Sequence, residues 1–266
     1  MPSRGPSTPT SARRDGRAAT RHGVARVLSK FGVCSRSEAA AWVRAGRVAV
    51  EGRIVRDPET PVHAGHDRVA VDGVAVVPRE RVYVMLNKPR GYVTSAADER
   101  GRETVYALLD GAGLPWLAPV GRLDKASEGL LLLTNDSAWA ARVTAPDAHV
   151  DKTYHVQIDR LPDAALLDAL GRGVDDRGER LAPKSVRELR RGDRHAWLEI
   201  VLDEGRNRQI RRMLSALGVD VLRLVRVAVG GLPLGTLAKG GWRRLAPDEA
   251  ERAFGPAPDR RDDDAR

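Results

Sequence analysis

The sequence predicts an α+β fold with about two domains. Its 266 residues correspond to roughly two domains at about 150 residues each, enough chain to bury a core. Short strand patterns are interleaved with a few helical ones without regular alternation, which favours a mixed α+β fold over a doubly wound one. The segment Pro78-Arg79-Glu80 indicates a linker. The expected divisions are a disordered basic tail at 1–22, a small domain at 23–78, a larger domain at 81–250 and a second disordered tail at 255–266.

The composition is that of a soluble globular protein with excess positive charge. Lys and Arg number 45 against 36 Asp and Glu, a net charge of +9, and 42% of the residues are hydrophobic. Fixed positive charge attracts phosphate, so the excess points to an anionic partner. The single cysteine, Cys34, excludes an internal disulfide and favours a cytoplasmic protein. Apolar runs such as Leu130–Leu133 are too short to span a membrane, and we expect neither a membrane span nor a secretory signal.

The small domain is expected to hold two helices followed by short strands. Apolar residues at helical spacing predict the first helix: Val24, Val27, Leu28 and Phe31. After a break at Gly32, Ser35 and Glu38 form a capping box for a second helix that ends at Gly46. Strand patterns separated by turn residues follow at 47–50, 53–55 and 68–71.

The larger domain shows strand patterns and two helical ones. Strands are expected at 82–86, 130–134, 153–158 and 196–202, and a helix runs from Pro162 through Leu170. A second helix at 207–217 is amphipathic, and its apolar face consists of Ile210, Met213, Leu214 and Leu217. Arg208 and Arg212 occupy the opposite sector, whereas Arg211 lies at the border of the two faces.

Residues 25–73 resemble the S4 RNA-binding domain. The segments that carry the resemblance are Leu28-Ser29-Lys30-Phe31-Gly32-Val33-Cys34-Ser35-Arg36 and Ala45-Gly46-Arg47-Val48-Ala49-Val50-Glu51-Gly52. The resemblance implies a helix pair that presents basic residues to structured RNA. The candidate phosphate ligands are Lys30, Arg36, Arg44, Arg47 and Arg53. The alternative reading of these cations is a solvated charged surface, and Ser37 stands where many relatives carry a second Arg.

The larger domain contains a sixteen-residue segment that points to chemistry. It reads Gly121-Arg122-Leu123-Asp124-Lys125-Ala126-Ser127-Glu128-Gly129-Leu130-Leu131-Leu132-Leu133-Thr134-Asn135-Asp136. A carboxylate between two cations, followed by Gly and an apolar strand, is expected to stay ionised at the edge of a buried sheet. Such an Asp can act as a nucleophile or a base, although an isolated loop Asp is usually a cap or turn residue.

This segment closely resembles the catalytic motif of the ribosomal RNA pseudouridine synthases that carry an S4 domain. Three further segments match that family in order, namely 86–91, 152–154 and 204–213, and the resemblance extends from residue 25 to about 247. It implies a mixed, largely antiparallel sheet in the catalytic domain. It also implies isomerisation of uridine without a cofactor. The N-glycosidic bond is broken, the uracil is rotated, and C5 is joined to C1′ of the same ribose.

The resemblance also implies roles for three catalytic residues. Asp124 is the catalytic carboxylate, which either attacks C1′ or takes the 2′ proton; the sequence leaves both routes open. Arg211 is expected to pair with Asp124, reaching inward from its border position on the helix. Tyr154 is expected to stack against the flipped base and to assist proton movement at C5.

Further residues are expected to bind substrate RNA. Arg122 would hold the extruded nucleotide or its phosphate, and Lys88 would shape the cleft. Basic residues in and beside the amphipathic helix would contact phosphates, namely Arg206, Arg208 and Arg212.

The sequence therefore predicts an RNA pseudouridine synthase that acts on ribosomal RNA, with large-subunit RNA preferred. Its partner would be ribosomal RNA or an assembling ribosomal subunit, and a monomer is expected. The alternative is a non-catalytic S4-domain ribosome-assembly factor, which loss of Asp124 or Arg211 would favour, and both are present. A glycosidase would need a second acid, for which Glu128 is the only close candidate. No cofactor or metal is expected, because the six histidines are scattered and His63 and His66 share only a weak spacing.

Overall fold

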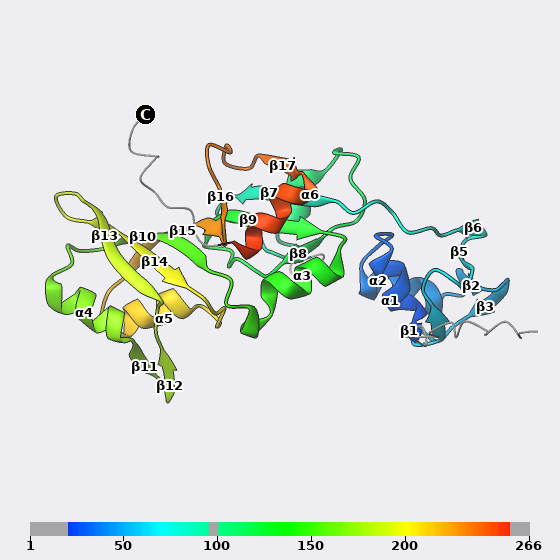
Figure 1. Ribbon diagram of the computed structural model, residues 1–266, viewed down its shortest axis with the longest axis horizontal. Helices are drawn as coiled ribbons and strands as arrows, with labels where there is room; N and C mark the ends of the chain where they lie inside the picture. Colours follow the sequence, from blue (N-terminus) through cyan, green and yellow to red (C-terminus); the bar gives the residue numbers. More distant parts are fainter. Residues whose placement is uncertain (1–20, 96–100, 256–266) are drawn as a thin grey trace, which may run out of the picture. The chain divides into compact units, whose positions relative to one another are not determined.

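The computed structural model describes residues 21–95 and 101–255, which divide into two compact units (Figure 1). One unit holds the described residues up to Leu28 together with Arg36–Val77, and the other holds Ser29–Ser35 and the described residues from Pro78 onward. The predicted tails lie outside the described residues, except at their inner ends.

The N-terminal unit combines two helices with short antiparallel strands. The helices are α1 (Val24–Lys30) and α2 (Arg36–Arg44), and a four-stranded sheet has the order β3-β2-β5-β6. Its strands are β2 (Val48–Val50), β3 (Arg53–Val55), β5 (Val69–Val71) and β6 (Val74–Ala75). The periodicity of the first helix is confirmed, because Val24, Val27 and Leu28 are fully buried. The predicted end of the second helix is also confirmed, since Gly46 adopts the left-handed φ of +75° that favours glycine.

One boundary of this unit differs from the prediction. Residues 21 and 22, expected in the tail, form β1 (Arg21–Gly23), which pairs antiparallel with β4 (Pro61–His63). A three-residue strand of this kind carries no periodic signal of its own. It forms because the distant β4 offers free backbone groups, and local sequence reasoning does not detect such a partner.

The C-terminal unit is built on one mixed sheet with the strand order β13-β14-β10-β15-β9-β7-β17, to which β8 and β16 add at β9 and β15. The strands are β7 (Tyr83–Lys88), β8 (Ala118–Val120), β9 (Glu128–Thr134), β10 (Lys152–Ile158), β13 (Ser185–Arg191), β14 (Ala196–Leu202), β15 (Val221–Val229), β16 (Leu232–Pro233) and β17 (Trp242–Leu245). The β15–β9 pair is parallel and the other pairs are antiparallel, which confirms the expected mixed, largely antiparallel sheet.

Helices and one hairpin complete this unit. The α-helices are α3 (Ser137–Thr144), α4 (Ala164–Arg172), α5 (Gln209–Ala216) and α6 (Pro247–Ala250), with 3₁₀ turns η1 (Val105–Leu109), η2 (Pro146–Ala148) and η3 (Glu251–Phe254). The hairpin pairs β11 (Val174–Asp176) with β12 (Glu179–Leu181). Helix α4 begins later than predicted because the Asp163 carboxylate caps it, accepting from Leu166 N. None of the described helices is long and apolar enough to cross a bilayer.

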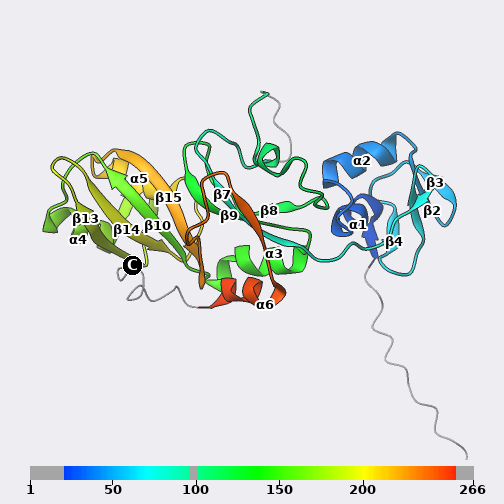
Figure 2. The same ribbon diagram turned by 90° about the horizontal axis from the view of Figure 1, so that it is seen from above.

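The two faces of the sheet are covered differently. Alternate residues of β10 and β14, among them Val156 and Ile200, pack against α4 and α5. Against the opposite face, at β7 and β9, α3 and α6 lie side by side (Figure 2). There Trp139 contacts Tyr83 edge-on. The face that carries α5 continues past Tyr154 to η1 and the loop before β9, because Tyr154 packs against both of those clusters. This continuous face carries the site described next.

Candidate active site

Asp124 lies in the loop between β8 and β9, and a buried lysine holds that loop. Lys88, at the end of β7, is fully buried. Its Nζ donates to the carbonyl oxygens of Asp124 at 3.1 Å, Ser127 at 2.8 Å and Pro89 at 3.1 Å. Burial lowers the pKa of Lys88 to about 8. The prediction that Lys88 binds RNA is therefore wrong, since its ammonium group is enclosed and bonded to backbone; its expected role in shaping the cleft fits this position.

The remaining carbonyl groups of the loop are held from three other segments. Thr94 Oγ1 donates to Leu123 O at 2.8 Å, Gly91 N to Lys125 O at 2.8 Å, and Arg211 Nη2 to Ala126 O at 3.2 Å. Together with the Lys88 bonds, all five consecutive carbonyl groups from 123 to 127 accept a hydrogen bond. The backbone beneath the Asp124 side chain is therefore fixed before any ligand arrives.

Gly129 is required where the loop enters β9. Its φ is +100°, and a Cβ atom at this position would lie 2.2 Å from the carbonyl oxygen of Arg226. Arg226 is itself buried, and its Nε donates to Leu130 O at 2.7 Å. The parallel contact between β9 and β15 is thus made where only glycine fits.

The carboxylate of Asp124 is partly exposed and faces a guanidinium group. Its side chain is 32% exposed, and Arg208 Nη1 lies 3.3 Å from its Oδ2. Arg208 caps α5 with a left-handed backbone, φ +49°. A non-glycine residue in this conformation is strained, and such strain is concentrated at functional sites.

The predicted pairing of Asp124 with Arg211 is replaced by this contact. Among the described residues, Asp124 forms an ion pair within 4 Å with Arg208 and not with Arg211. The helical wheel assumed that Arg208 lies inside the helix, whereas α5 begins one residue later, at Gln209. The left-handed turn sends the Arg208 side chain away from the sector that the wheel assigns to it.

Arg211 lies close to Asp124 without touching its carboxylate. Besides Ala126 O, it donates from Nη1 to Val221 O at 3.3 Å, so it joins the loop to the start of β15. Burial lowers the pKa of Arg211 below its ordinary value; Arg208 adds to this and Asp124 opposes it. Its Nε is buried and has no hydrogen-bond partner among the described residues.

Tyr154 and Arg122 border the same loop. Tyr154, on β10, packs against a buried cluster that includes Leu123, the residue before Asp124. Tyr154 therefore lies on the strand between β14 and β15, against the same buried cluster that holds the residue before Asp124. Arg122 is exposed and has no ion-pair partner within the described ranges, which leaves its guanidinium group open to a ligand.

Two arginines predicted to contact phosphate are already matched by acids. Arg212 pairs with Asp176 at 2.5 Å and Glu179 at 2.7 Å. Arg206 pairs with Glu204 at 2.8 Å and Glu179 at 3.0 Å. The β11–β12 hairpin supplies two of these acids, so Arg212 fastens α5 to the hairpin and Arg206 fastens the segment before α5 to it. Neither arginine is free to bind phosphate in this structure.

The comparisons with known proteins agree with this geometry. The profile of the family described as RNA pseudouridylate synthase matches residues 82–216, about half of the chain, and the S4 domain profile matches residues 24–69. The chain belongs to the RNA pseudouridylate synthase family. Members of this family are isomerases, and the matched segment contains the Asp124 loop, Tyr154 and α5.

Relatives of this pseudouridine synthase match along most of their length. The chain is 36% identical over 230 residues to a protein of Bacillus subtilis named ribosomal large subunit pseudouridine synthase B, covering 85% of this chain and 93% of the relative. It is 37% identical to an uncharacterized RNA pseudouridine synthase of Mycobacterium leprae, covering 86% and 91%. A crystal structure of a pseudouridylate synthase superposes with a TM-score of 0.61 and 31% identity, covering 87% of this chain and 99% of that one.

Four of the five RNA ligands predicted in the S4 domain of this synthase are exposed, but two of them are paired. Arg36 contacts Glu59 at 3.0 Å. Arg47 donates to Asp72 and lies over the ring of Trp42 at 5.0 Å. The other predicted ligands are Lys30 in the last turn of α1, Arg44 at the end of α2, and Arg53 on β3; Arg44 and Arg53 have no ion-pair partner among the described residues.

Glu128, four residues after Asp124, is a structural acid in this synthase. Its side chain is 4% exposed and pairs with Arg223 at 3.2 Å and Lys239 at 2.5 Å. Burial acts to raise the pKa of Glu128, but the hydrogen bonds from Arg223 and Lys239 outweigh it and lower the pKa. A glycosidase would need a second acid beside Asp124, and Glu128 is committed elsewhere. Within the described ranges, no group of three His, Cys, Asp or Glu residues gathers to hold a metal ion.

Sequence reasoning missed three of the residues that build the site. Thr94 bonds to the backbone of the Asp124 loop at Leu123, Arg226 bonds to the backbone of β9 at Leu130, and Arg223 pairs with Glu128. The arginines interrupt an apolar strand, Val221–Val229, which is an unusual position for charge and could have signalled a buried partner. Thr94 carries no comparable signal.

Proposed function

We propose that this chain converts specific uridines of ribosomal RNA, preferably large-subunit RNA, to pseudouridine, with Asp124 as the catalytic carboxylate and without a cofactor. The observation that carries the proposal is the setting of Asp124. Its carboxylate is partly exposed, faces Arg208, and stands on a loop with five hydrogen-bonded carbonyl groups. The choice of large-subunit RNA is supported by the name of the Bacillus subtilis relative.

The reaction is an isomerisation, so nothing is added or lost overall. The bond between N1 of uracil and C1′ breaks, the uracil turns within the site, and C5 bonds to C1′. The proton on C5 leaves and N1 ends protonated. A carboxylate near the sugar can serve either by attacking C1′ or by taking the 2′ proton, and both routes require it to stay in place while the base turns.

The neighbouring residues divide the remaining tasks. Arg208 supplies positive charge beside the Asp124 carboxylate. Arg211 keeps the loop in register through Ala126 O. Tyr154 offers a ring against which the flipped uracil stacks, and its phenol assists proton movement at C5. Arg122, exposed next to Asp124, holds the phosphate of the extruded nucleotide.

RNA recognition is assigned in part to the S4 domain. A uridine must be unstacked to reach Asp124, so loops and single-stranded segments are the natural targets. The S4 domain supplies affinity through exposed cations such as Arg44 and Arg53. The partner is ribosomal RNA or an assembling ribosomal subunit in the cytoplasm, and the protein acts as a monomer.

A pseudouridine map of ribosomal RNA tests this function. RNA is compared from cells with the wild-type protein, cells without it, and cells that carry Asp124→Ala. We expect one uridine, or a small cluster, to lose its modification in both altered strains. Identical maps in all three strains would contradict the proposal for ribosomal RNA and favour the S4-domain assembly factor that binds without turnover.

A further inference from the structure

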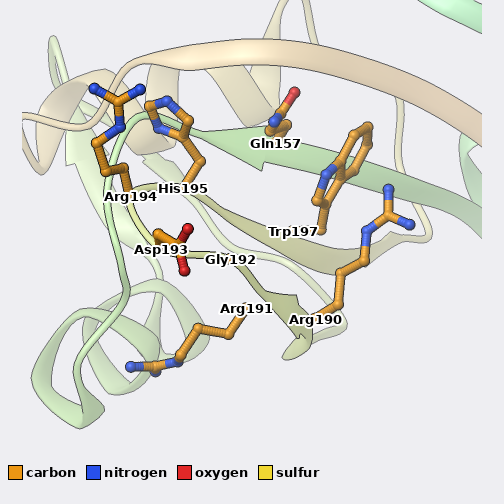
Figure 3. A pocket seen from close by; sticks show the side chains of 8 residues that line it. All are labelled: Gln157, Arg190, Arg191, Gly192, Asp193, Arg194, His195 and Trp197. Atoms are coloured by element: carbon orange, nitrogen blue, oxygen red, sulfur yellow. The ribbon is translucent and has the colours of Figure 1, made fainter.

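A second candidate site lies at the β13–β14 hairpin, on the face of the sheet opposite to the one that packs against α4 and α5. We call this the outer face. A pocket of about 350 Å³ is lined by Gln157, Arg190, Arg191, Gly192, Asp193, Arg194, His195 and Trp197 (Figure 3). Gln157 is the register partner of Trp197, which in turn pairs with Arg190, so these three side chains form a row across three strands. Their neighbours Val156 and Leu198 point to the opposite face, into the cluster under α4 and α5.

The outer face is therefore separate from the Asp124 site. Tyr154 and Val156 share one face of β10, whereas His155 and Gln157 share the other. The thickness of the sheet lies between the pocket and the catalytic loop. A ligand in the pocket cannot be the uridine at Asp124, and it must be a different group or a different part of the same RNA.

The arginines around the pocket fall into two classes. Arg187 and Arg191 are matched by acids, at 2.8 Å from Glu199 and 2.6 Å from Glu188. Arg190 and Arg194 are exposed and have no ion-pair partner in the part of the chain that the structure describes.

An aromatic ring and an unused nitrogen accompany these two arginines. The guanidinium group of Arg190 lies 4.7 Å from the centre of the Trp197 ring, and that of Arg223 lies 5.5 Å from it. Nδ1 of His195 is buried and has no hydrogen-bond partner among the described residues. One acid, Asp193, also lines the pocket, so the two unpaired arginines leave it with a net positive charge.

We propose that this pocket is a second RNA-binding site that holds a phosphate of the substrate RNA away from the target uridine. The proposal rests on the proposed function for the identity of the RNA. Planar guanidinium groups bind phosphate oxygens in pairs, and Arg190 and Arg194 are available to do so. The Trp197 ring, which lies close to the guanidinium groups of Arg190 and Arg223, offers an aromatic surface beside the phosphate ligands to a neighbouring base. The pocket then sets affinity and register, while Asp124 sets chemistry.

The first test compares charge removal at the pocket with charge removal elsewhere in the same unit. Arg190→Ala/Arg194→Ala is the test variant. Arg172→Ala is the control for each single charge, since Arg172 is exposed at the end of α4 and has no ion-pair partner in the described part of the chain. The probe is an in vitro transcript of bacterial large-subunit ribosomal RNA.

We expect the double variant to raise Kd and KM for the transcript about tenfold and to leave kcat within twofold. The slope of log Kd against log salt should fall by about 1 to 2, as one or two phosphate contacts are lost. Arg172→Ala should change Kd less than twofold. Equal losses of RNA affinity per removed charge in the test and control variants would overturn the proposal. They would show that the arginines of the pocket act only through nonspecific attraction between a basic protein and RNA.

A crosslink gives a direct readout that needs no turnover. The only cysteine of the chain, Cys34, is buried, so Arg194→Cys can carry a photoreactive label at one exposed position. We expect a crosslink to the transcript at a nucleotide other than the modified uridine, competed by unlabelled transcript and absent with Arg172→Cys. No competed crosslink at position 194 would overturn the pocket proposal even if the wild type makes pseudouridine. A competed crosslink without any pseudouridine would instead overturn the proposed function and leave the pocket as an RNA site.

Discussion

The buried cations that hold the backbone of the Asp124 loop and of β9 and the cations of the S4 domain are the same residue types in opposite situations. Lys88 and Arg226 are buried and bond to backbone carbonyl groups, and Arg211 is half-buried and does the same. Arg36 and Arg47 are exposed, and their partners are acids on the surface. The first group holds the shape of a loop, whereas the second forms ion pairs at the surface, where solvent and salt reach them. Burial, which the residue type does not reveal, decides which of these two situations a cation meets.

The energetic scale differs accordingly. An exposed ion pair contributes about 0 to 1 kcal/mol and is screened by salt. Removing the donor from a buried polar network leaves acceptors without partners, at about 1 to 3 kcal/mol for each group. Substitutions of the buried cations near Asp124 should therefore change both stability and catalysis, whereas substitutions of exposed cations in the S4 domain should change RNA affinity alone.

The largest effect is expected for Asp124→Asn. The side chain keeps its size but loses the charge that reacts, so turnover should fall by at least about 10⁴-fold, while the Kd for RNA stays within a few fold. The measurement is pseudouridine formation in a single-turnover assay, with binding measured on the same preparation. A parallel loss of RNA affinity would contradict the assignment of chemistry to Asp124 and of RNA binding to the exposed cations. Unchanged thermal unfolding is the control for folding.

Lys88→Met should come next, with losses in both stability and rate. The three carbonyl groups that Nζ serves would lose their donor, and we expect about 3 kcal/mol of lost stability in urea unfolding. Displacement of the loop should lower kcat about 100-fold. Lys184→Met is the matched control, because Lys184 is half-exposed and its partner is the carboxylate of Asp151 at 2.8 Å. A loss as large in the control would remove the distinction between the two kinds of cation.

The same lysine gives a pH dependence with a definite sign. The pKa of Lys88 is about 8 in the folded chain and about 10.5 when unfolded. Between these values the unfolded chain binds the proton and the folded chain does not, so the contribution of Lys88 to the free energy of unfolding increases as pH rises from 8 to 10.5. Unfolding of wild type and Lys88→Met across this window should show the wild type gaining stability relative to the variant. A constant difference would mean that the ammonium group stays charged.

Arg208→Gly should separate catalysis from stability. Glycine removes the guanidinium group that faces Asp124, and kcat should fall about 10- to 100-fold. Glycine also suits the φ of +49°, so the free energy of unfolding should stay equal or rise by up to about 1 kcal/mol. Measuring kcat and urea unfolding for this variant should show a lower kcat with no loss of stability. Arg208→Gln keeps the strain and should lose rate without that compensation.

Local patterns predicted elements but not the partners of their side chains. The alternation at 196–202 predicts β14 with the bounds that the structure shows, since a half-buried strand alternates apolar and polar residues along its own sequence. The pairing of Arg212 with Asp176 and Glu179 joins residues more than 30 positions apart, and no pattern in the sequence near α5 indicates it. The left-handed turn at Arg208 is equally hidden, because a helical wheel assumes the conformation it is used to predict. The motif therefore located Asp124, while the tertiary contacts decided which cation meets it.

The smallest effect, and the finest test of the comparison, is expected within the S4 domain. Arg53 has no ion-pair partner in the described part of the chain, whereas Arg47 donates to Asp72 and stacks on Trp42. Arg53→Ala should raise the Kd for RNA about three- to fivefold and lower the salt slope by about 1. Arg47→Ala should do less than half of this, because Arg47 would have to leave its acid to bind phosphate. Salt titrations of RNA binding measure both. Equal slopes would show that the Arg47–Asp72 pair opens when RNA binds, in which case a surface partner does not commit a cation in the way that burial does.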